Sequence, residues 1–105
     1  MIETRLLHYF LAIAREQSIT RAAESLHVTQ PTLSKQMMDL ERQLGKQLLV
    51  RGKKKVTLTD EGAYLRNRAQ EMIDLMERTE AAFHDEDQTL GGDVYLGCGE
   101  TRVME

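Results

Sequence analysis

Residues 18–45, SITRAAESLHVTQPTLSKQMMDLERQLG, hold the pattern that decides the fold. Ser18 and Thr20 offer side-chain oxygens that can cap a first helix, and Thr29 can cap a second one. Pro31 fits the first turn of the second helix, because the first amides of a helix have no internal partners. Gly45 stands where a left-handed residue would end that helix. We therefore expect two helices joined by a three-residue turn, which is a helix-turn-helix.

The segments around this motif predict what it packs against. From Glu3 onward, apolar residues recur every three or four positions and predict a further helix with one apolar face. These residues are Leu6, Leu7, Phe10, Ile13 and Ala14. Segments 48–51 and 56–58 flank a turn at residues 52–54 and predict a small hairpin with a basic tip. The expected fold is mostly α: a three-helix winged helix-turn-helix with a small β-hairpin wing and a long C-terminal helix.

The long helix is expected over residues 59–90, capped by Thr59 and ended by two glycines. Apolar residues along it recur in steps of three and four, which is the repeat of a coiled-coil seam. The seam residues proposed for a dimer interface are Leu65, Ala69, Met72, Met76 and Phe83. Because an unpaired seam would leave these side chains in water, we expect a homodimer formed through this helix.

Length and composition exclude several classes of protein. A chain of 105 residues and 12.0 kDa has room for one modest core, and 41% hydrophobic with only 5% aromatic residues favours packed helices. No run approaches the roughly 20 apolar residues of a membrane span, so we expect a cytoplasmic protein without membrane contact. The single cysteine, Cys98, and three scattered histidines predict no disulfide, no metal and no cofactor.

The net charge of −3 hides an uneven distribution. Residues 1–58 carry ten basic and five acidic side chains, whereas the remainder carries four basic and twelve acidic ones. Residues 1–58 therefore have a net charge of +5. This part suits contact with a polyanion, because the local potential at a contact matters more than the net charge of the whole chain. A chance distribution of solvated charges is the alternative.

The start of the second helix of the motif is expected to be exposed and polar. Gln30 can form two hydrogen bonds with an adenine edge, and the hydroxyls of Thr32 and Ser34 can contact bases or phosphates. Lys35 adds a charge, and Pro31 presents an apolar surface that suits a thymine methyl group. Because the N-terminal end of such a helix enters the major groove, these residues are candidate DNA contacts. Ordinary surface polarity is the alternative.

The expected hairpin carries four cations within the five positions 51–55. These cations are Arg51, Lys53, Lys54 and Lys55. Such a cluster suits phosphates or the negative potential of a narrow minor groove. The alternative is a solvated loop with no partner.

These residues resemble the N-terminal winged helix-turn-helix of LysR-type transcriptional regulators. The resemblance rests on the order and spacing of motifs over about 60 residues. The motifs are Leu6-x-x-Tyr9-Phe10, SITRAA at 18–23, Leu26, TQPTLS at 29–34, Leu40-Glu41, Leu44-Gly45, Leu48 to Arg51, VTLT at 56–59, and Gly62. In one departure, Leu49 stands where members of the family commonly carry phenylalanine.

The resemblance implies a bacterial regulator that binds double-stranded DNA as a dimer or tetramer. It implies a DNA-binding domain over 1–58, a linker and dimerisation helix over 59–90, and a truncated start of an effector-binding domain over 91–105. Residues 92–97, GDVYLG, would form the first strand of that domain, and a small-molecule effector would bind only through its missing part. A frayed tail of a complete domain is the alternative for 91–105.

The resemblance also assigns roles to the candidate site residues. It maps one set onto recognition-helix contacts: Gln30, Pro31, Thr32, Ser34 and Lys35. It maps Thr20 onto a phosphate contact, and it maps Arg51, Lys53 and Lys54 onto the wing.

Two other classes of function compete with DNA binding. The same helices and basic hairpin could serve a protein-interaction adaptor that meets an acidic partner without specific DNA binding. A catalytic domain with its active residues in a missing portion is a weaker third alternative. Because the sequence has no nucleophile with a base at catalytic spacing and no phosphate-binding glycine loop, we do not expect an enzyme.

Overall fold

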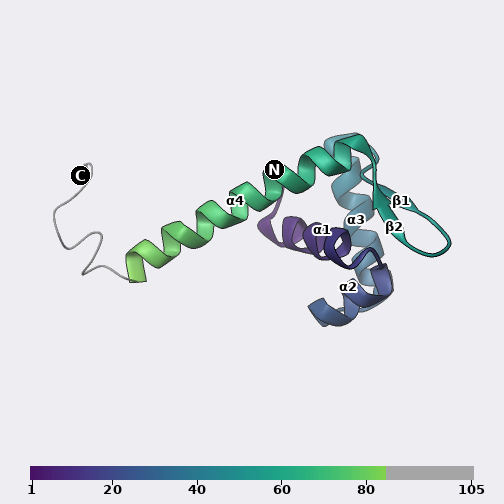
Figure 1. Cartoon of the computed structure of the whole chain (residues 1–105), viewed down its shortest axis with the longest axis horizontal. Helices are drawn as coiled ribbons and strands as arrows, with labels where there is room; N and C mark the ends of the chain where they lie inside the picture. Colours follow the sequence, from purple (N-terminus) through teal and green to yellow (C-terminus); the bar gives the residue numbers. More distant parts are fainter. Residues whose placement is uncertain (85–105) are drawn as a thin grey trace. The chain divides into compact units, whose positions relative to one another are not determined.

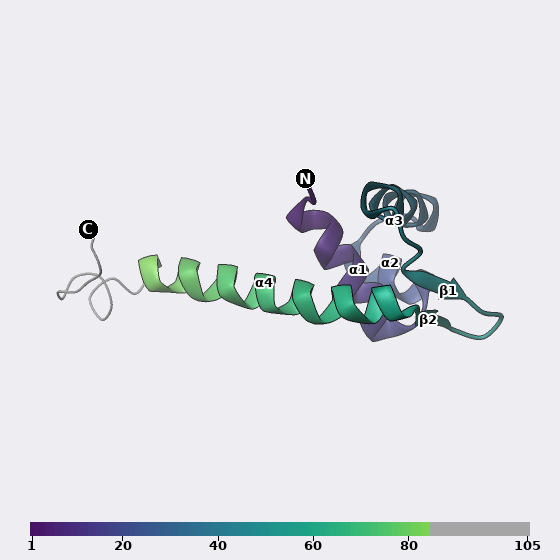
Figure 2. The ribbon, with the colours of Figure 1, turned by 90° about the horizontal axis from the view of Figure 1, so that it is seen from above.

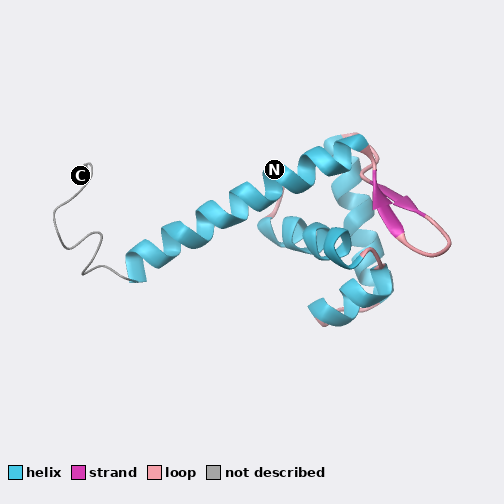
Figure 3. Cartoon of the chain, viewed as in Figure 1, coloured by secondary structure: helices cyan, strands magenta, loops and turns pink. Residues whose placement is uncertain are grey.

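The computed structural model describes residues 1–84, which form four helices and one two-stranded hairpin (Figures 1 and 3). The elements are α1 (Thr4–Glu16), α2 (Ile19–Leu26), α3 (Gln30–Leu44), β1 (Leu49–Arg51), β2 (Val56–Leu58) and α4 (Asp60–His84). The expected mostly helical fold with a hairpin wing is confirmed. The expected extension of the last helix to residue 90, the segment 91–105 and Cys98 lie outside the described residues.

Local chemistry sets the helix boundaries. The side-chain oxygens of Ser18, Thr29 and Thr59 accept hydrogen bonds from backbone amides in the first turns of α2, α3 and α4, at 3.1, 3.3 and 3.0 Å. Gly45 ends α3 in the left-handed conformation, with a φ of 70°. Ser18, Thr29 and Thr59 therefore act as the caps expected from the sequence, whereas the other candidate, Thr20, lies inside α2 and does not cap it.

Apolar side chains of α1, α2 and α3 make the centre of the core. Phe10 and Ile13 of α1 and Leu33 of α3 are completely buried. Ala22 and Ala23 of α2 are buried as well, and their small side chains let α2 approach α1 and α3 closely. Leu49, where the resemblance implies a phenylalanine, is 2% exposed and therefore fills a core position.

Polar contacts fasten the hairpin to the helices. The Glu41 carboxylate in α3 accepts hydrogen bonds from the backbone amides of Leu48 and Leu49, at 2.8 and 3.1 Å. On the other strand, the Val56 amide donates to the carbonyl of Gln17, which follows α1, at 2.9 Å. These contacts satisfy backbone groups that the short sheet leaves without partners, and they fix the base of the hairpin.

Gly62 allows the start of α4 to pack against the chain that enters β1. A Cβ atom at this position would lie 2.1 Å from the carbonyl oxygen of Leu48, which is far closer than any side chain tolerates. The Thr59 amide donates to the same carbonyl at 3.1 Å. The glycine is therefore required by a close backbone approach rather than by its φ angle.

The hairpin itself is short and antiparallel, with Leu49 opposite Leu58 and Arg51 opposite Val56. The Gly52 amide donates to the carbonyl of Lys55 at 3.0 Å and closes the loop. In both Figure 1 and Figure 2 this loop extends away from the helices. Its basic tip is therefore presented to solvent.

The chain divides into two units, Met1–Glu71 and Met72–Glu105. The first contains the helical bundle, the hairpin and the first turns of α4. In the second, residues 72–84 continue α4, and Ile73 is buried while Met72, Leu75, Met76 and Phe83 are exposed. Within residues 1–84, none of the helices has the length and apolar character needed to cross a membrane.

Candidate nucleic-acid interface

The turn between α2 and α3 determines which part of α3 reaches the surface. His27 takes the left-handed conformation, with a φ of 61°, and its amide bonds back to carbonyls in the last turn of α2. Thr29 then caps α3, so the chain changes direction within three residues. The first turn of α3 is consequently exposed, while Leu33 of the same helix points into the core.

The side chains at this end of α3 are partly ordered by their own hydrogen bonds. The Thr29 hydroxyl donates to the Thr32 hydroxyl at 2.8 Å and also accepts from the Thr32 amide. Gln30, Pro31 and Lys35 are exposed beside this pair. The end of α3 thus presents hydroxyl, amide and ammonium groups to solvent, with the backbone held by the cap.

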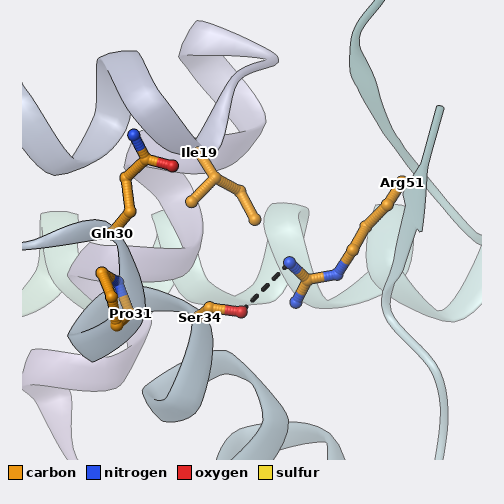
Figure 4. Close-up of a pocket in the computed structure, with 5 residues that line it drawn as sticks. All are labelled: Ile19, Gln30, Pro31, Ser34 and Arg51. Atoms are coloured by element: carbon orange, nitrogen blue, oxygen red, sulfur yellow. Dashed lines mark hydrogen bonds between the residues drawn. The ribbon is translucent and has the colours of Figure 1, made fainter. Parts of the chain in front are cut away.

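An open hollow of about 530 Å³ lies between this end of α3 and the hairpin (Figure 4). Gln30, Pro31 and Ser34 line it from α3, Ile19 from α2 and Arg51 from β1. Arg51 Nη1 donates a hydrogen bond to Ser34 Oγ at 3.2 Å, across 17 positions of sequence. This bond joins the wing to the exposed end of α3.

The cations near this hollow form no ion pairs, unlike four of the other eight lysines and arginines in residues 1–84. Four arginines elsewhere form ion pairs with carboxylates: Arg5, Arg15, Arg42 and Arg68. Within residues 1–84, no ion pair involves the cations of the wing or of the exposed end of α3, which are Lys35, Arg51, Lys53, Lys54 and Lys55. Their charge is therefore not neutralised locally and is available to an anionic partner.

The structure brings four of the predicted contact residues together around the hollow: Gln30, Pro31, Ser34 and Arg51. Thr32 and Lys35 are exposed on the same end of α3, and Thr20 is exposed in the first turn of α2. Lys53 and Lys54 are exposed at the tip of the hairpin. We call these nine residues together the α3–wing surface.

Sequence reasoning missed Ile19, which also lines the hollow. Its only local signal is an apolar residue directly after the Ser18 cap, which is equally typical of a core position. The bond between Arg51 and Ser34 was missed too, because it depends on how the hairpin folds back toward α3. Both features come from tertiary structure.

The structure separates the five predicted seam residues of α4 into two groups. Leu65 and Ala69 are 7% and 0% exposed within the unit Met1–Glu71, so they belong to the core of a single chain. Met72, Met76 and Phe83 are exposed, and so is Leu75, which was not among the predicted seam residues. We call Met72, Leu75, Met76 and Phe83 the apolar stripe of α4.

The described side chains offer no site for a metal ion. Within residues 1–84, no three or more histidine, cysteine, aspartate or glutamate side chains come together as potential ligands. The α3–wing surface itself presents hydrogen-bonding groups, positive charge and the apolar ring of Pro31.

Comparison with known proteins identifies related sequences. The family model of the bacterial regulatory helix-turn-helix proteins of the lysR family matches residues 4–63, which is more than half of the chain. The nitrogen assimilation regulatory protein nac of Escherichia coli is 43% identical over 93 residues, covering 89% of this chain and 30% of that protein. The transcriptional regulator BenM of Acinetobacter baylyi is 49% identical over 63 residues, or 60% of this chain and 21% of that protein.

Solved structures agree with these sequence matches. A complex of the BenM DNA-binding domain with benA site 1 DNA has a TM-score of 0.77 at 38% identity, over 80% of this chain and 98% of that one. A complex of the CbnR DNA-binding domain with DNA has a TM-score of 0.77 at 33% identity, over 83% and 100% of the two chains. The present chain spans about 30% of the length of nac.

Proposed function

We propose that this chain, which belongs to the LysR family of bacterial regulatory helix-turn-helix proteins, binds double-stranded DNA in a sequence-specific manner through its α3–wing surface. The role is binding rather than catalysis, and it is exercised in the cytoplasm, where bacterial DNA resides. BenM and CbnR DNA-binding domains form complexes with DNA, and their folds are similar to this one.

The observation that carries the proposal is the exposed first turn of α3 beside cations without ion-pair partners in the described chain. The N-terminal end of a helix is the part that reaches base edges in a major groove. Here that end carries Gln30, Thr32 and Lys35 in exposed positions. The hairpin adds the exposed Lys53 and Lys54, whose charges suit contact with phosphates.

The residues divide by the kind of contact that their chemistry allows. Gln30 offers both a donor and an acceptor and suits an adenine edge, whereas Pro31 offers only an apolar surface. Thr20, Lys53 and Lys54 suit phosphates, which position the protein without reading sequence. We therefore assign specificity to α3 and most of the salt-dependent affinity to the wing.

We further propose that two copies pair through the apolar stripe of α4. Met72, Leu75, Met76 and Phe83 are 42–65% exposed, an unusual density of large apolar side chains for a helix in water. Pairing by a two-fold axis would give two copies of α3 for a pseudo-palindromic operator. We also propose that tetramer formation and control by a small-molecule effector require the full length of such regulators. This chain spans about 30% of the length of nac.

Salt titration of DNA binding tests the role of the wing. Duplexes selected from a randomised library by the 105-residue chain serve as specific probes, and unselected duplexes as the control. Changing Lys53 and Lys54 to Ala should weaken binding to both. It should also make the slope of log K against log salt shallower by about 0.9 for each phosphate that the variant no longer neutralises. An unchanged slope would remove the wing from the interface.

The Gln30→Ala variant tests base reading with the same probes. It should relax the preference at one position of each half-site and cost roughly 1–3 kcal/mol on specific duplexes only. Equal losses of affinity on selected and unselected duplexes would contradict a base-reading role. If the wild-type chain binds neither class in a salt-sensitive manner, the protein-interaction adaptor becomes the better explanation.

A further inference from the structure

The hydrogen bond between Arg51 and Ser34 determines which donors and acceptors the hollow beside α3 offers to a ligand. Arg51 Nη1 donates to Ser34 Oγ at 3.2 Å, so the serine oxygen is the acceptor of this bond (Figure 4). A serine in a helix can also donate its proton to the carbonyl four residues earlier, as Thr79 does to Leu75 at 2.7 Å. Within residues 1–84 Ser34 forms no such bond, so its hydroxyl proton has no acceptor in the described chain.

Both polar groups of this pair therefore offer hydrogens to a ligand. A guanidinium has five N–H donors and no acceptor, and only one of the five is used here. The remaining lone pair of Ser34 lies beside a positive charge, which repels the hydrogen of an incoming donor. A ligand group in the hollow is therefore expected to present an acceptor oxygen or nitrogen.

The other walls of the hollow limit the ligand further. Ile19 and the ring of Pro31 give it two apolar sides, and Gln30 stands at its rim with an amide that can donate or accept. Guanine and thymine present keto oxygens in the major groove, and thymine adds a methyl group beside its oxygen. Adenine and cytosine instead present amino groups at the corresponding positions, where their hydrogens would face the donors of Arg51 and Ser34. The N7 acceptor is common to adenine and guanine and does not distinguish them.

From this geometry we propose that Arg51 is a positioning residue that fixes Ser34 as a hydrogen-bond donor, and that the hollow selects a keto base over an amino base at one position of each half-site. The inference rests on the proposed DNA binding and adds to it the chemical class of base that this hollow accepts. It gives Arg51 a role in specificity, distinct from the phosphate contacts assigned to the hairpin tip.

The test compares three variants of the 105-residue chain on the selected duplexes, with each half-site position changed in turn to all four bases. Ser34→Ala removes the donor, and Arg51→Met removes the guanidinium while keeping an unbranched side chain. Lys53→Met is the matched control, because it removes one wing cation that has no bond to Ser34. Thermal unfolding of each variant confirms that it folds, since these side chains lie outside the core.

The wild-type chain should prefer guanine or thymine over adenine and cytosine by about tenfold at one position per half-site. Ser34→Ala and Arg51→Met should each reduce that ratio to below about threefold at this position and leave the preferences elsewhere intact. Lys53→Met should weaken binding to every duplex by the same factor and leave the ratio unchanged.

Two results would overturn the inference while leaving the proposed function in place. In the first, Arg51→Met makes the salt slope shallower and weakens binding to all duplexes equally, which would make Arg51 a phosphate contact. In the second, the position that responds to Ser34→Ala prefers adenine or cytosine. A wild-type chain that shows no sequence preference at any position would instead refute the proposed function itself.

Discussion

The N-terminal unit and the distal part of α4 use apolar residues in opposite ways. Within Met1–Glu71, large side chains such as Phe10, Leu33 and Leu40 are completely buried by the same chain. In residues 72–84, the apolar stripe of α4 stays 42–65% exposed. These large side chains of the first region are covered by the chain itself, whereas the apolar stripe of the second region presents surface that the described chain does not cover. Stability and assembly should therefore respond to separate sets of mutations.

Replacing one phenylalanine in each region gives the largest expected contrast. Phe10→Ala opens a cavity at a position that is 0% exposed and should cost about 3–5 kcal/mol of unfolding free energy. Phe83→Ala removes the same side chain from a position that is 65% exposed, and should change the unfolding free energy of the monomer by no more than about 0.5 kcal/mol. Urea unfolding at low protein concentration measures both.

The two phenylalanine variants could also respond alike. If Phe83→Ala destabilises the monomer as strongly as Phe10→Ala, the distal part of α4 is part of the same core, and the proposed division of roles is incorrect.

A charge in the apolar stripe of α4 gives the next largest effect, this time on assembly. Met76→Asp would bury a carboxylate in the proposed dimer contact and should weaken association by about 2–3 kcal/mol. Ala81→Asp is the matched control, because residue 81 is exposed and lies about 140° around the helix from residue 76. Sedimentation velocity should show dissociation of the first variant only. Dimers that persist in Met76→Asp would place the pairing surface elsewhere.

The sequence predicts the local features of this fold because they depend on neighbouring residues. Ser18, Thr29 and Thr59 cap helices through amides three positions away, and Gly45 ends α3 through its own backbone angle. Such signals need no knowledge of the rest of the chain. The exposure of Gln30 follows equally from the turn that precedes it.

Features that depend on which partner covers a surface are not predictable in this way. The repeat in α4 correctly indicates an apolar face, but periodicity does not distinguish a core of the same chain from a contact with a second copy. Leu65 and Ala69 lie in the first kind of contact, while Met76 remains exposed. The bond from Arg51 to Ser34 is hidden for a related reason, because its partners are 17 positions apart in the sequence.

The smallest expected effect comes from Glu41, which attaches the hairpin to α3 within the N-terminal unit. Its carboxylate accepts from the amides of Leu48 and Leu49 and so anchors the chain entering the hairpin. Glu41→Gln keeps an acceptor oxygen but loses the charge that strengthens both bonds, and should cost about 1 kcal/mol. Glu24→Gln, at an exposed position of α2, is the control and should be neutral. Equal urea midpoints for the two variants would show that the Glu41 charge contributes nothing to the anchor, and that buried Leu48 and Leu49 hold the base of the wing by packing alone.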